Sequence, residues 1–370
     1  MAKIPNKRNF SHPCFDGPVP RRAAFPSITK GKMMWLKKQH DVVRRTFLRT
    51  LRHSACVALA LASLAPLHAA DFPTKPITLV VPFPAGGGPD QVARVIAEKL
   101  APRLGRPVVV ENRQGASGTM GAAHVFRAPA DGHTLLLTPS TFSLAPLVLQ
   151  KGVVPYDVRR DFVPVIQPTT SWLVLAAHPS TQVRSLAQLK QFATTHANTI
   201  YTGSGAGSTM HVAGEMLKHE LKVDMTFVPH RGTAPALADT IGGHIQFIIA
   251  GYQDLAPHFK AGALLPVALL DDTPHPTDAS VVPVARQGYP SYSVRSWTGI
   301  FAPSATAPDI VNRLNAEIDA VLHMPEVRGR LEDNGLQQVV GGKPGRLTAT
   351  VEHDLKVFTP FVRGAGIVAN

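Results

Sequence analysis

The feature that most constrains the fold is a unit of strand, glycine-rich loop and helix that recurs along the chain. The β-branched run Ile77–Val81 stops at Pro82, and after a glycine-rich turn residues 90–104 carry apolar side chains at helical spacing. The same order returns at residues 108–110, which precede a second glycine-rich loop and another helix. Strands that alternate with helices predict an α/β fold with largely parallel sheets.

A second series of the same units fills the middle of the chain. Strands are predicted at residues 173–177, 199–201, 225–228 and 245–249, with helices at 186–197, 211–219 and 234–241. An amphipathic helix follows at Pro308–Leu322. About 300 residues suffice for two ordinary domains with buried cores, so we expect two.

The first 70 residues differ from the rest of the chain in charge. They hold 13 of the 38 basic residues but only 2 of the 25 acidic ones, which leaves 25 basic and 23 acidic residues for the remainder. A nearly neutral body offers no broad surface for phosphates, so we expect no nucleic-acid partner. Both cysteines, Cys14 and Cys56, also lie in this segment, and the body therefore has no disulfide or cysteine-based metal site.

Residues 33–70 have the order of an export signal. Arg44 and Arg45 precede the apolar run 55–67, and small residues stand just before Asp71. The apolar run, about 13 residues, falls short of the roughly 20 that a membrane-spanning helix needs. Paired arginines fit a twin-arginine signal or an ordinary one, and both remain open. We expect residues 1–32 to be a mis-assigned upstream extension and the mature, periplasmic chain to begin near Asp71.

Three loops, at residues 84–90, 115–119 and 203–209, place glycine and small hydroxyl residues between a strand and a helix. Helix starts present unpaired N–H groups and a partial positive charge, and glycine lets a ligand approach them closely. In an open α/β sheet such loops lie where ligands usually bind. A single loop of this kind is more often a plain connection, but the three together predict a site for a carboxylate or a phosphate.

The loops do not match the enzymatic versions of such motifs. The first lacks the Lys-Ser/Thr ending of a P-loop, and the third has the wrong spacing for a dinucleotide fingerprint. None of Ser117, Ser204 and Ser208 has the flanking glycines of a hydrolase nucleophile elbow. His211 and Glu215 share a helix face, but no second histidine lies one turn away. We therefore expect no enzyme, no cofactor and no metal.

Three residues near these loops have two interpretations each. Asp90 is either a helix cap that also shapes its loop or a binding carboxylate, and the cap is favoured. Arg231 either contacts an anionic ligand or lies on the surface. Trp297 either lines a cleft or packs in the core, and the core is favoured.

A series of motifs runs in order from Phe72 to the end of the chain. The motifs are PFPAGGGPD at 82–90, ENR at 111–113, GASG at 115–118, ADGHTLL at 130–136, PYD at 155–157, DFVPV at 161–165, GAGS at 205–208, VPHRG at 228–232 and WTGIFAP at 297–303. As an ordered set they closely resemble the substrate-binding receptors of tripartite tricarboxylate transporters, also called Bug receptors.

The resemblance implies a type II periplasmic-binding-protein fold, with two α/β lobes and a ligand cleft between them. Residues 71–173 plus 296–370 would form lobe 1, and residues 174–295 lobe 2. Backbone N–H groups and ordered waters would hold the ligand's carboxylate. The implied partners are a small organic carboxylate, such as a di- or tricarboxylate, and the membrane subunits of a transporter; a sensor that signals to a histidine kinase is the alternative. We expect a monomer.

Carried over by position, the resemblance implies ligand-binding residues in four loops. They are Phe83, Pro84, Ala85, Gly86 and Gly87 with Asp90, then Ser140, then Ser204, Gly205, Gly207, Ser208 and Thr209, and finally Arg231 and Gly232. The chain departs from the family at His230, where tyrosine is usual, and at Ala250, where an acid often follows the strand. Because such an acid would pair with a ligand's amino group, we expect a dicarboxylate or an aromatic or aliphatic acid, not an amino acid.

Overall fold

Ten strands form one mixed sheet in the computed structural model, which describes residues 72–150, 152–333, 337–365 and 367. The predicted upstream extension and export signal lie outside these residues. The strands are β1 (Ile77–Val81), β2 (Val108–Asn112), β3 (Thr134–Pro139), β4 (Phe162–Ala177), β5 (Ile200–Thr202), β6 (Thr226–Val228), β7 (Phe247–Gly251), β8 (Leu265–Leu269), β9 (Arg295–Pro303) and β10 (Gln338–Val339).

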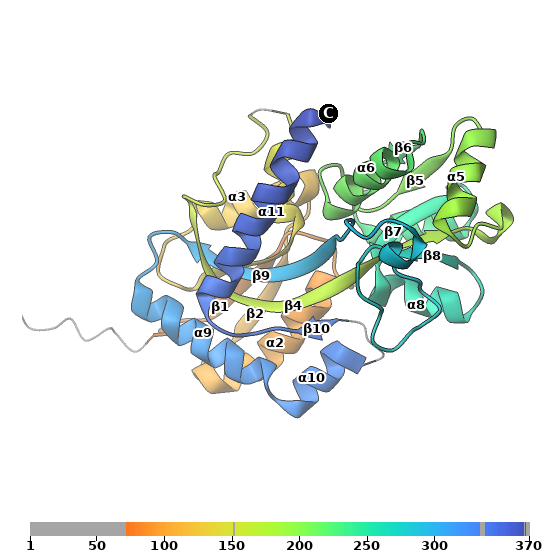
Figure 1. The fold of residues 1–370 in the computed structure, drawn as a ribbon. Helices are drawn as coiled ribbons and strands as arrows, with labels where there is room; N and C mark the ends of the chain where they lie inside the picture. The colour runs from red at the N-terminus through yellow and green to blue at the C-terminus, as the bar shows by residue number, and fades with distance from the viewer. Residues whose placement is uncertain (1–71, 151, 334–336, 366, 368–370) are drawn as a thin grey trace, which may run out of the picture. The chain divides into compact units, whose positions relative to one another are not determined.

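Helices cover both faces of this sheet (Figure 1). They are α2 (Gly88–Leu104), α3 (Thr119–Phe126), α4 (Thr141–Val148), α5 (Leu186–Thr195), α6 (Thr209–Leu221), α7 (Thr233–Ile241), α8 (Tyr252–Lys260), α9 (Pro308–Leu322), α10 (Pro325–Glu332) and α11 (Pro344–Gly364). Each predicted strand and helix is present within a few residues of its expected bounds, and α9 has the predicted bounds at both ends. No helix in the described ranges is long and apolar enough to span a membrane.

The expectation of largely parallel sheets is wrong for the centre of the sheet. β1 pairs in parallel with β2 and β3, and β5 with β6 and β7, as the strand–helix–strand units predict. β4 and β9, however, run antiparallel to each of their neighbours. Only residues 173–177 of β4 were predicted as a strand, and β9 was not predicted. The strand–helix alternation does not indicate the antiparallel pairing of these strands with distant segments.

β4 joins two halves of the sheet. Its residues 162–172 pair with β9, and its residues 173–177 pair with β7 and β8. We call β1, β2, β3, β9, β10 and the start of β4 the first half, and β5 to β8 with the end of β4 the second half. The chain passes from the first half to the second along β4 and returns where β9 begins at Arg295.

Alternation along the strands gives each half two apolar layers. In the second half, Leu173 and Leu175 pack with α5 and α6, whereas Val174 and Ala176 pack with α7 and α8. In the first half, Leu79 packs with α2 and α9, and its neighbour in β1 packs with α3 and α11. Figure 1 shows α2, α9 and α10 together on one face of this half, with α3 and α11 on the other.

Candidate functional site

A cavity of about 170 Å³ lies between the two halves of the sheet. One water molecule takes up roughly 30 Å³ of liquid, so the cavity suits a small metabolite and is smaller than the roughly 300–1,000 Å³ of a drug-sized pocket. Its walls are the loop before α2, the starts of α4, α7 and α8, and hydroxyl residues of β4 and β9. The lining residues are Phe83 to Pro89, Pro139, Thr141, Ser171, Leu173, Ser204, Met210, Gly232, Thr233, Ala234, Leu237, Gly251, Gln253, Asp254, Ser296, Thr298 and Gln337.

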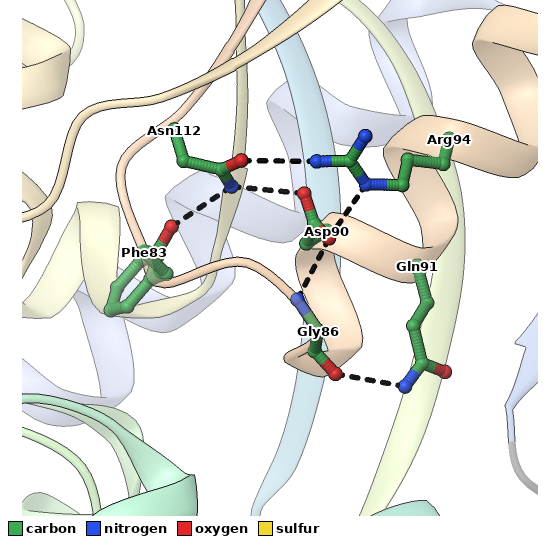
Figure 2. A network of polar contacts seen from close by, with 6 residues as sticks. All are labelled: Phe83, Gly86, Asp90, Gln91, Arg94 and Asn112. Atoms are coloured by element: carbon green, nitrogen blue, oxygen red, sulfur yellow. Dashed lines mark hydrogen bonds and ion pairs between the residues drawn. The ribbon is translucent and has the colours of Figure 1, made fainter.

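The loop before α2 is held by the buried side chain of Asp90 (Figure 2). Asp90 Oδ2 accepts hydrogen bonds from Gly86 N at 2.8 Å and Arg94 Nε at 2.9 Å. Asp90 Oδ1 accepts one from Asn112 Nδ2 at 2.9 Å, and the same amide donates to Phe83 O at 3.1 Å. Gly86 has φ +83°, a left-handed conformation that favours glycine. Both ends of the turn are thereby fixed against the cavity.

Asp90 therefore shapes the loop, as the favoured interpretation predicts, although Gly87 and not Asp90 occupies the N-cap position of α2. The carboxylate belongs to the first turn of the helix, where the helix dipole favours negative charge. Burial by itself would raise the pKa of Asp90, but hydrogen bonds from Arg94, Gly86 and Asn112 outweigh it and hold the pKa below its ordinary value. The side chain does not line the cavity.

A chain of hydroxyl groups supports the opposite wall. Ser140 Oγ lies 2.6 Å from Thr209 Oγ1 and 3.1 Å from Ser296 Oγ, and the last of these lines the cavity. Ser208 caps α6, where its Oγ accepts the backbone N–H of His211. Ser140, Ser208 and Thr209 are buried, so their hydroxyl groups connect α4, α6 and β9 behind the cavity wall.

A second space, which we call the outer hollow, adjoins the cavity at Phe83 and Gly232. It has a volume of about 610 Å³ and is also lined by His230, Arg231 and residues 114–118. Both ring nitrogens of His230 are engaged, Nδ1 with Thr202 Oγ1 and Nε2 with Asp239 Oδ2, each at 2.8 Å. These contacts tie His230 to its own half of the sheet.

The structure brings together part of the predicted ligand-binding set. Phe83, Pro84, Ala85, Gly86, Gly87, Ser204 and Gly232 line the cavity. Gly205, His230 and Arg231 line the outer hollow. Asp90, Ser140, Gly207, Ser208, Thr209 and Ala250 line neither space.

Two residues of α8 line the cavity without having been predicted, Gln253 and Asp254. Among the described lining residues, Asp254 carries the only ionisable side chain. Burial raises its pKa to about 6. Gly251 ends β7 just before α8, so this is a fourth example of a strand, a glycine and a helix start. That pattern is visible in the sequence, but it has one glycine where the three predicted loops have several.

His211 and Glu215, which the sequence analysis considered as metal ligands, are both bonded to other groups of this protein. His211 Nδ1 accepts the backbone N–H of Gly207 at 3.1 Å, and burial lowers the pKa of His211 to about 4. Glu215 accepts a hydrogen bond from Tyr201 Oη at 2.7 Å and forms an ion pair with Lys218. In the part of the chain that the structure describes, no group of three His, Cys, Asp or Glu could hold a metal ion.

Trp297 belongs to the core, as the favoured interpretation predicts. Its indole is buried beside Phe301, and its Nε1 donates to Asp354 Oδ2 at 2.8 Å. Ser143 Oγ donates to the same oxygen at 3.2 Å. Burial raises the pKa of Asp354 to about 6 despite these two hydrogen bonds.

An α/β sheet in two halves with a small cavity between them defines the class of periplasmic solute-binding proteins. Residues 92–354 match the model of the tripartite tricarboxylate transporter family receptor, and the chain belongs to that family. Its members are binding proteins and not enzymes.

Two curated relatives show how far the likeness extends. The UPF0065 protein in the tcbD-tcbE intergenic region of Pseudomonas sp. (strain P51) is 34% identical over 275 residues, which are 74% of this chain and 81% of the relative. Protein BugT of Bordetella pertussis is 31% identical over 303 residues, which are 82% of this chain and 93% of BugT.

Solved structures confirm the predicted fold. Rpa4515 of R. palustris, solved with adipate, is 32% identical with a TM-score of 0.76 and covers 80% of this chain and 99% of its own. MatC from Rhodopseudomonas palustris, solved with bound malate, is 30% identical with a TM-score of 0.72 and covers 79% of this chain and 100% of its own.

Proposed function

We propose that the protein captures a small organic carboxylate in the cavity and delivers it to the membrane subunits of a tripartite tricarboxylate-type secondary transporter. Membership of the receptor family supports the role in transport. The adipate in Rpa4515 and the malate in MatC support the ligand class. A di- or tricarboxylate or another organic acid fits this proposal.

The observation that carries the proposal is that helix starts meet at a cavity whose described lining has no basic side chain. Gly88 of α2, Thr233 of α7 and Tyr252 of α8 each begin a helix at or beside its wall. Unpaired N–H groups and the positive end of the helix dipole stabilise an anion there. Hydroxyl groups of Ser204 and Ser296 add donors.

We assign the predicted residues two roles in this site. Phe83 to Gly87, Ser204 and Gly232 contact the ligand, because they line the cavity. Asp90, Ser140, Ser208 and Thr209 keep those loops in place through the hydrogen bonds described above. Gly205, His230 and Arg231 lie at the outer hollow, where a ligand enters.

The proposal includes the predicted lobes and the route of export. Lobe 1, residues 71–173 plus 296–370, and lobe 2, residues 174–295, would close on the ligand by bending where β4 and β9 pass between the halves. Residues 33–70 would direct the chain to the periplasm and be removed. N-terminal sequencing of protein from the native host should find a start near Asp71, and retention of Met1 would contradict it.

A thermal-shift screen of the purified protein against organic acids tests the proposal. A ligand that binds the native state raises the melting temperature by mass action, by an amount that grows with its concentration. Ser204→Ala should weaken binding several-fold, whereas Ser280→Ala, at an exposed position outside the cavity, should not. Chemical turnover of a bound acid, or a screen without any stabilising acid, would contradict the proposal.

A further inference from the structure

The cavity has two ends of different chemistry. Phe83 and Gly232 line both the cavity and the outer hollow, so they mark one end. Gln253 and Gln337 line both the cavity and a third hollow, which contains Arg94 and Arg330, so they mark the other end. We call these the outer end and the inner end.

The outer end suits the ligand's carboxylate. The loop of Pro84 there lies against Gly232, since a Cβ added to Gly232 would come within 3.3 Å of Pro84 Cγ. Gly232 has φ +150° and stands directly before the first residue of α7, and Ser204, whose backbone carbonyl accepts the N–H of His230, brings a hydroxyl group to the cavity. Helix-start N–H groups and a hydroxyl donate hydrogen bonds, and none of them repels an anion.

The inner end adds acceptors to the starts of α2 and α8, which also lie there. Gln253 Nε2 points toward Asp254 Oδ2 at 3.4 Å, which orients the amide so that Oε1 faces away from that carboxylate. Gln253 Oε1 is buried and has no hydrogen-bond partner among the described residues. The amide is closely held, because a Cβ on Gly88 would lie only 2.9 Å from Gln253 Nε2. A buried acceptor without a partner costs free energy.

No cation of the described residues neutralises Asp254. Its carboxylate forms no ion pair within 4 Å, and no Lys, Arg or His lines the cavity. The basic residues of the third hollow already have acidic partners, Arg94 with Asp90 and Arg330 with Glu98. A second carboxylate at the inner end would therefore face the charge of Asp254 without compensation.

We propose that Asp254 and Gln253 select the ligand's far end, so that the protein prefers a monocarboxylate with a hydrogen-bond donor there, an ammonium group above all, over a dicarboxylate of equal length. This inference rests on the proposed function and narrows it. It also replaces the expectation drawn from Ala250: the acid that the family often has at that position is absent, but Asp254 supplies a carboxylate to the same cavity four residues later.

Two ligand series of matched length test this selection by isothermal titration at pH 7.5. One series is adipate, hexanoate, 6-hydroxyhexanoate and 6-aminohexanoate, and the shorter one is succinate, butanoate, 4-hydroxybutanoate and 4-aminobutanoate. Burial raises the pKa of Asp254 only to about 6, so its carboxylate is mainly ionised at this pH. We expect the amino acid to bind about tenfold more tightly than the dicarboxylate in at least one series, since each tenfold step is about 1.4 kcal/mol.

Variants of Asp254 test whether the inner end causes this ligand preference. Asp254→Asn keeps the shape of the side chain and removes its charge, so it should abolish the preference for the amino end and strengthen binding of the dicarboxylate. Asp254→Ser is a second variant with the same expected result, should the first not fold. Asp224→Asn, which removes an exposed charge outside the cavity, should leave the ligand order unchanged.

The outcomes separate this inference from the proposed function. Tighter binding of the dicarboxylate than of the amino acid to the wild type in both series, or an equal loss of affinity for all ligands in both Asp254 variants, would overturn the selection but leave carboxylate capture intact. Failure of every acid to bind the folded protein would contradict the proposed function and the inference with it.

Discussion

Asp90 accepts the backbone N–H of Gly86, four residues earlier in the chain, at 2.8 Å. This one contact joins the buried first turn of α2 to a loop that lines the cavity. The same carboxylate is bonded to Arg94 and Asn112, so the loop's position depends on a side chain that never reaches the ligand (Figure 2). Such supporting residues hold binding groups within the narrow limits that affinity requires.

Asp90→Asn should lower both stability and affinity. An amide has one acceptor oxygen, so it cannot accept from Gly86 and Arg94 on one side and from Asn112 on the other, and it lacks the charge that pairs with Arg94. A lost hydrogen bond to a charged group costs about 1.5–3 kcal/mol. We expect a loss of that size in urea unfolding and about tenfold weaker ligand binding by calorimetry. Asp309→Asn, in the exposed first turn of α9, is the matched control and should change neither by much. Unchanged affinity in the Asp90 variant would show that the loop does not need this contact.

The pH dependence of the same variant checks the electrostatic part of this account. The folded-state pKa of Asp90 is held below its ordinary 3.8, so its contribution to stability is present above about pH 4 and is lost as the pH falls through the folded pKa. The difference in unfolding free energy between the wild type and Asp90→Asn should therefore shrink below pH 4. A difference that stays constant down to pH 2.5 would be inconsistent with a lowered pKa.

Elements that a local sequence pattern marks could be predicted, whereas strands that depend on pairing between distant segments could not. α9 was predicted in full, because Pro308 and an apolar stripe mark it within fifteen residues. β9 pairs with β3 and β4 across more than a hundred residues of sequence, and no local pattern encodes that register. β9 and the first part of β4 were missed for this reason.

In the candidate site, too, the residues marked by a local sequence pattern could be predicted and those brought in from distant segments could not. The loop at residues 83–87 could be found, since its glycines stand between a clear strand and a clear helix. Asp254 could not, because nothing near it in sequence shows that the start of α8 meets the start of α2. α8 is also nine residues long with Pro257 inside it, so its helical pattern is weak. Ser140 and Thr209 were located near the site, but their mutual hydrogen bond, which explains their burial, required the folded chain.

Ser117 and Gly205 should control closure of the two halves. Ser117 Oγ donates to Ala206 O across the outer hollow at 2.5 Å, with Ser117 in a left-handed conformation at φ +54°. Ser117→Ala removes this bond, which is worth about 0.5–1.5 kcal/mol, so we expect roughly two- to tenfold weaker ligand binding and a larger radius of gyration with ligand present.

A double-mutant cycle sharpens that prediction. A Cβ at Gly205 would lie 2.5 Å from Ser117 Oγ but 3.5 Å from Ser117 Cβ, which is an ordinary contact. Gly205→Ala should therefore weaken binding when Ser117 is present and add nothing in the Ser117→Ala background, an interaction that titrations of all four proteins would reveal. If the losses of binding free energy in the two single variants add up in the double variant, Gly205→Ala does not act through Ser117.

Removal of Arg295 alone should destabilise the protein more than removal of both Arg295 and the charge of Asp271. Asp271 is fully buried, and Arg295 bonds both of its oxygens while its Nη2 donates to Thr273 Oγ1 at 2.7 Å. Arg295→Met leaves a buried carboxylate without its cation, which typically costs about 3–5 kcal/mol. Arg295→Met combined with Asp271→Asn should recover much of that loss in thermal and urea unfolding. A double variant as unstable as the single one would mean that packing of Arg295 over Trp172, and not charge, dominates.

Ionisation of Asp354 should cost the folded protein stability at neutral pH that it does not cost at mildly acidic pH. Burial raises its folded-state pKa from 3.8 to about 6, so folding favours the protonated form, and stability is lost as the pH rises from about 4 to 6. Two pKa units correspond to roughly 3 kcal/mol. Asp354→Asn keeps an oxygen that can accept from Trp297 Nε1 and removes the ionisation, so it should be more stable than the wild type at pH 7.5 and no more stable at pH 4.

The comparison variant is Asp354→Ala, which also removes the ionisation but leaves the buried Trp297 N–H without its acceptor. It should therefore lose about 1–3 kcal/mol relative to Asp354→Asn at every pH. Asp254 has a similarly raised pKa, so its own loss of stability between pH 4 and 6 should persist in Asp354→Asn. His211, whose pKa burial lowers to about 4, contributes the opposite trend over the same range, so each acid is measured as the difference between its variant and the wild type at each pH. Urea unfolding at pH 4, 5, 6 and 7.5 measures all of these differences, and an Asn variant less stable than the wild type throughout that range would refute the proposed cost of the buried carboxylate.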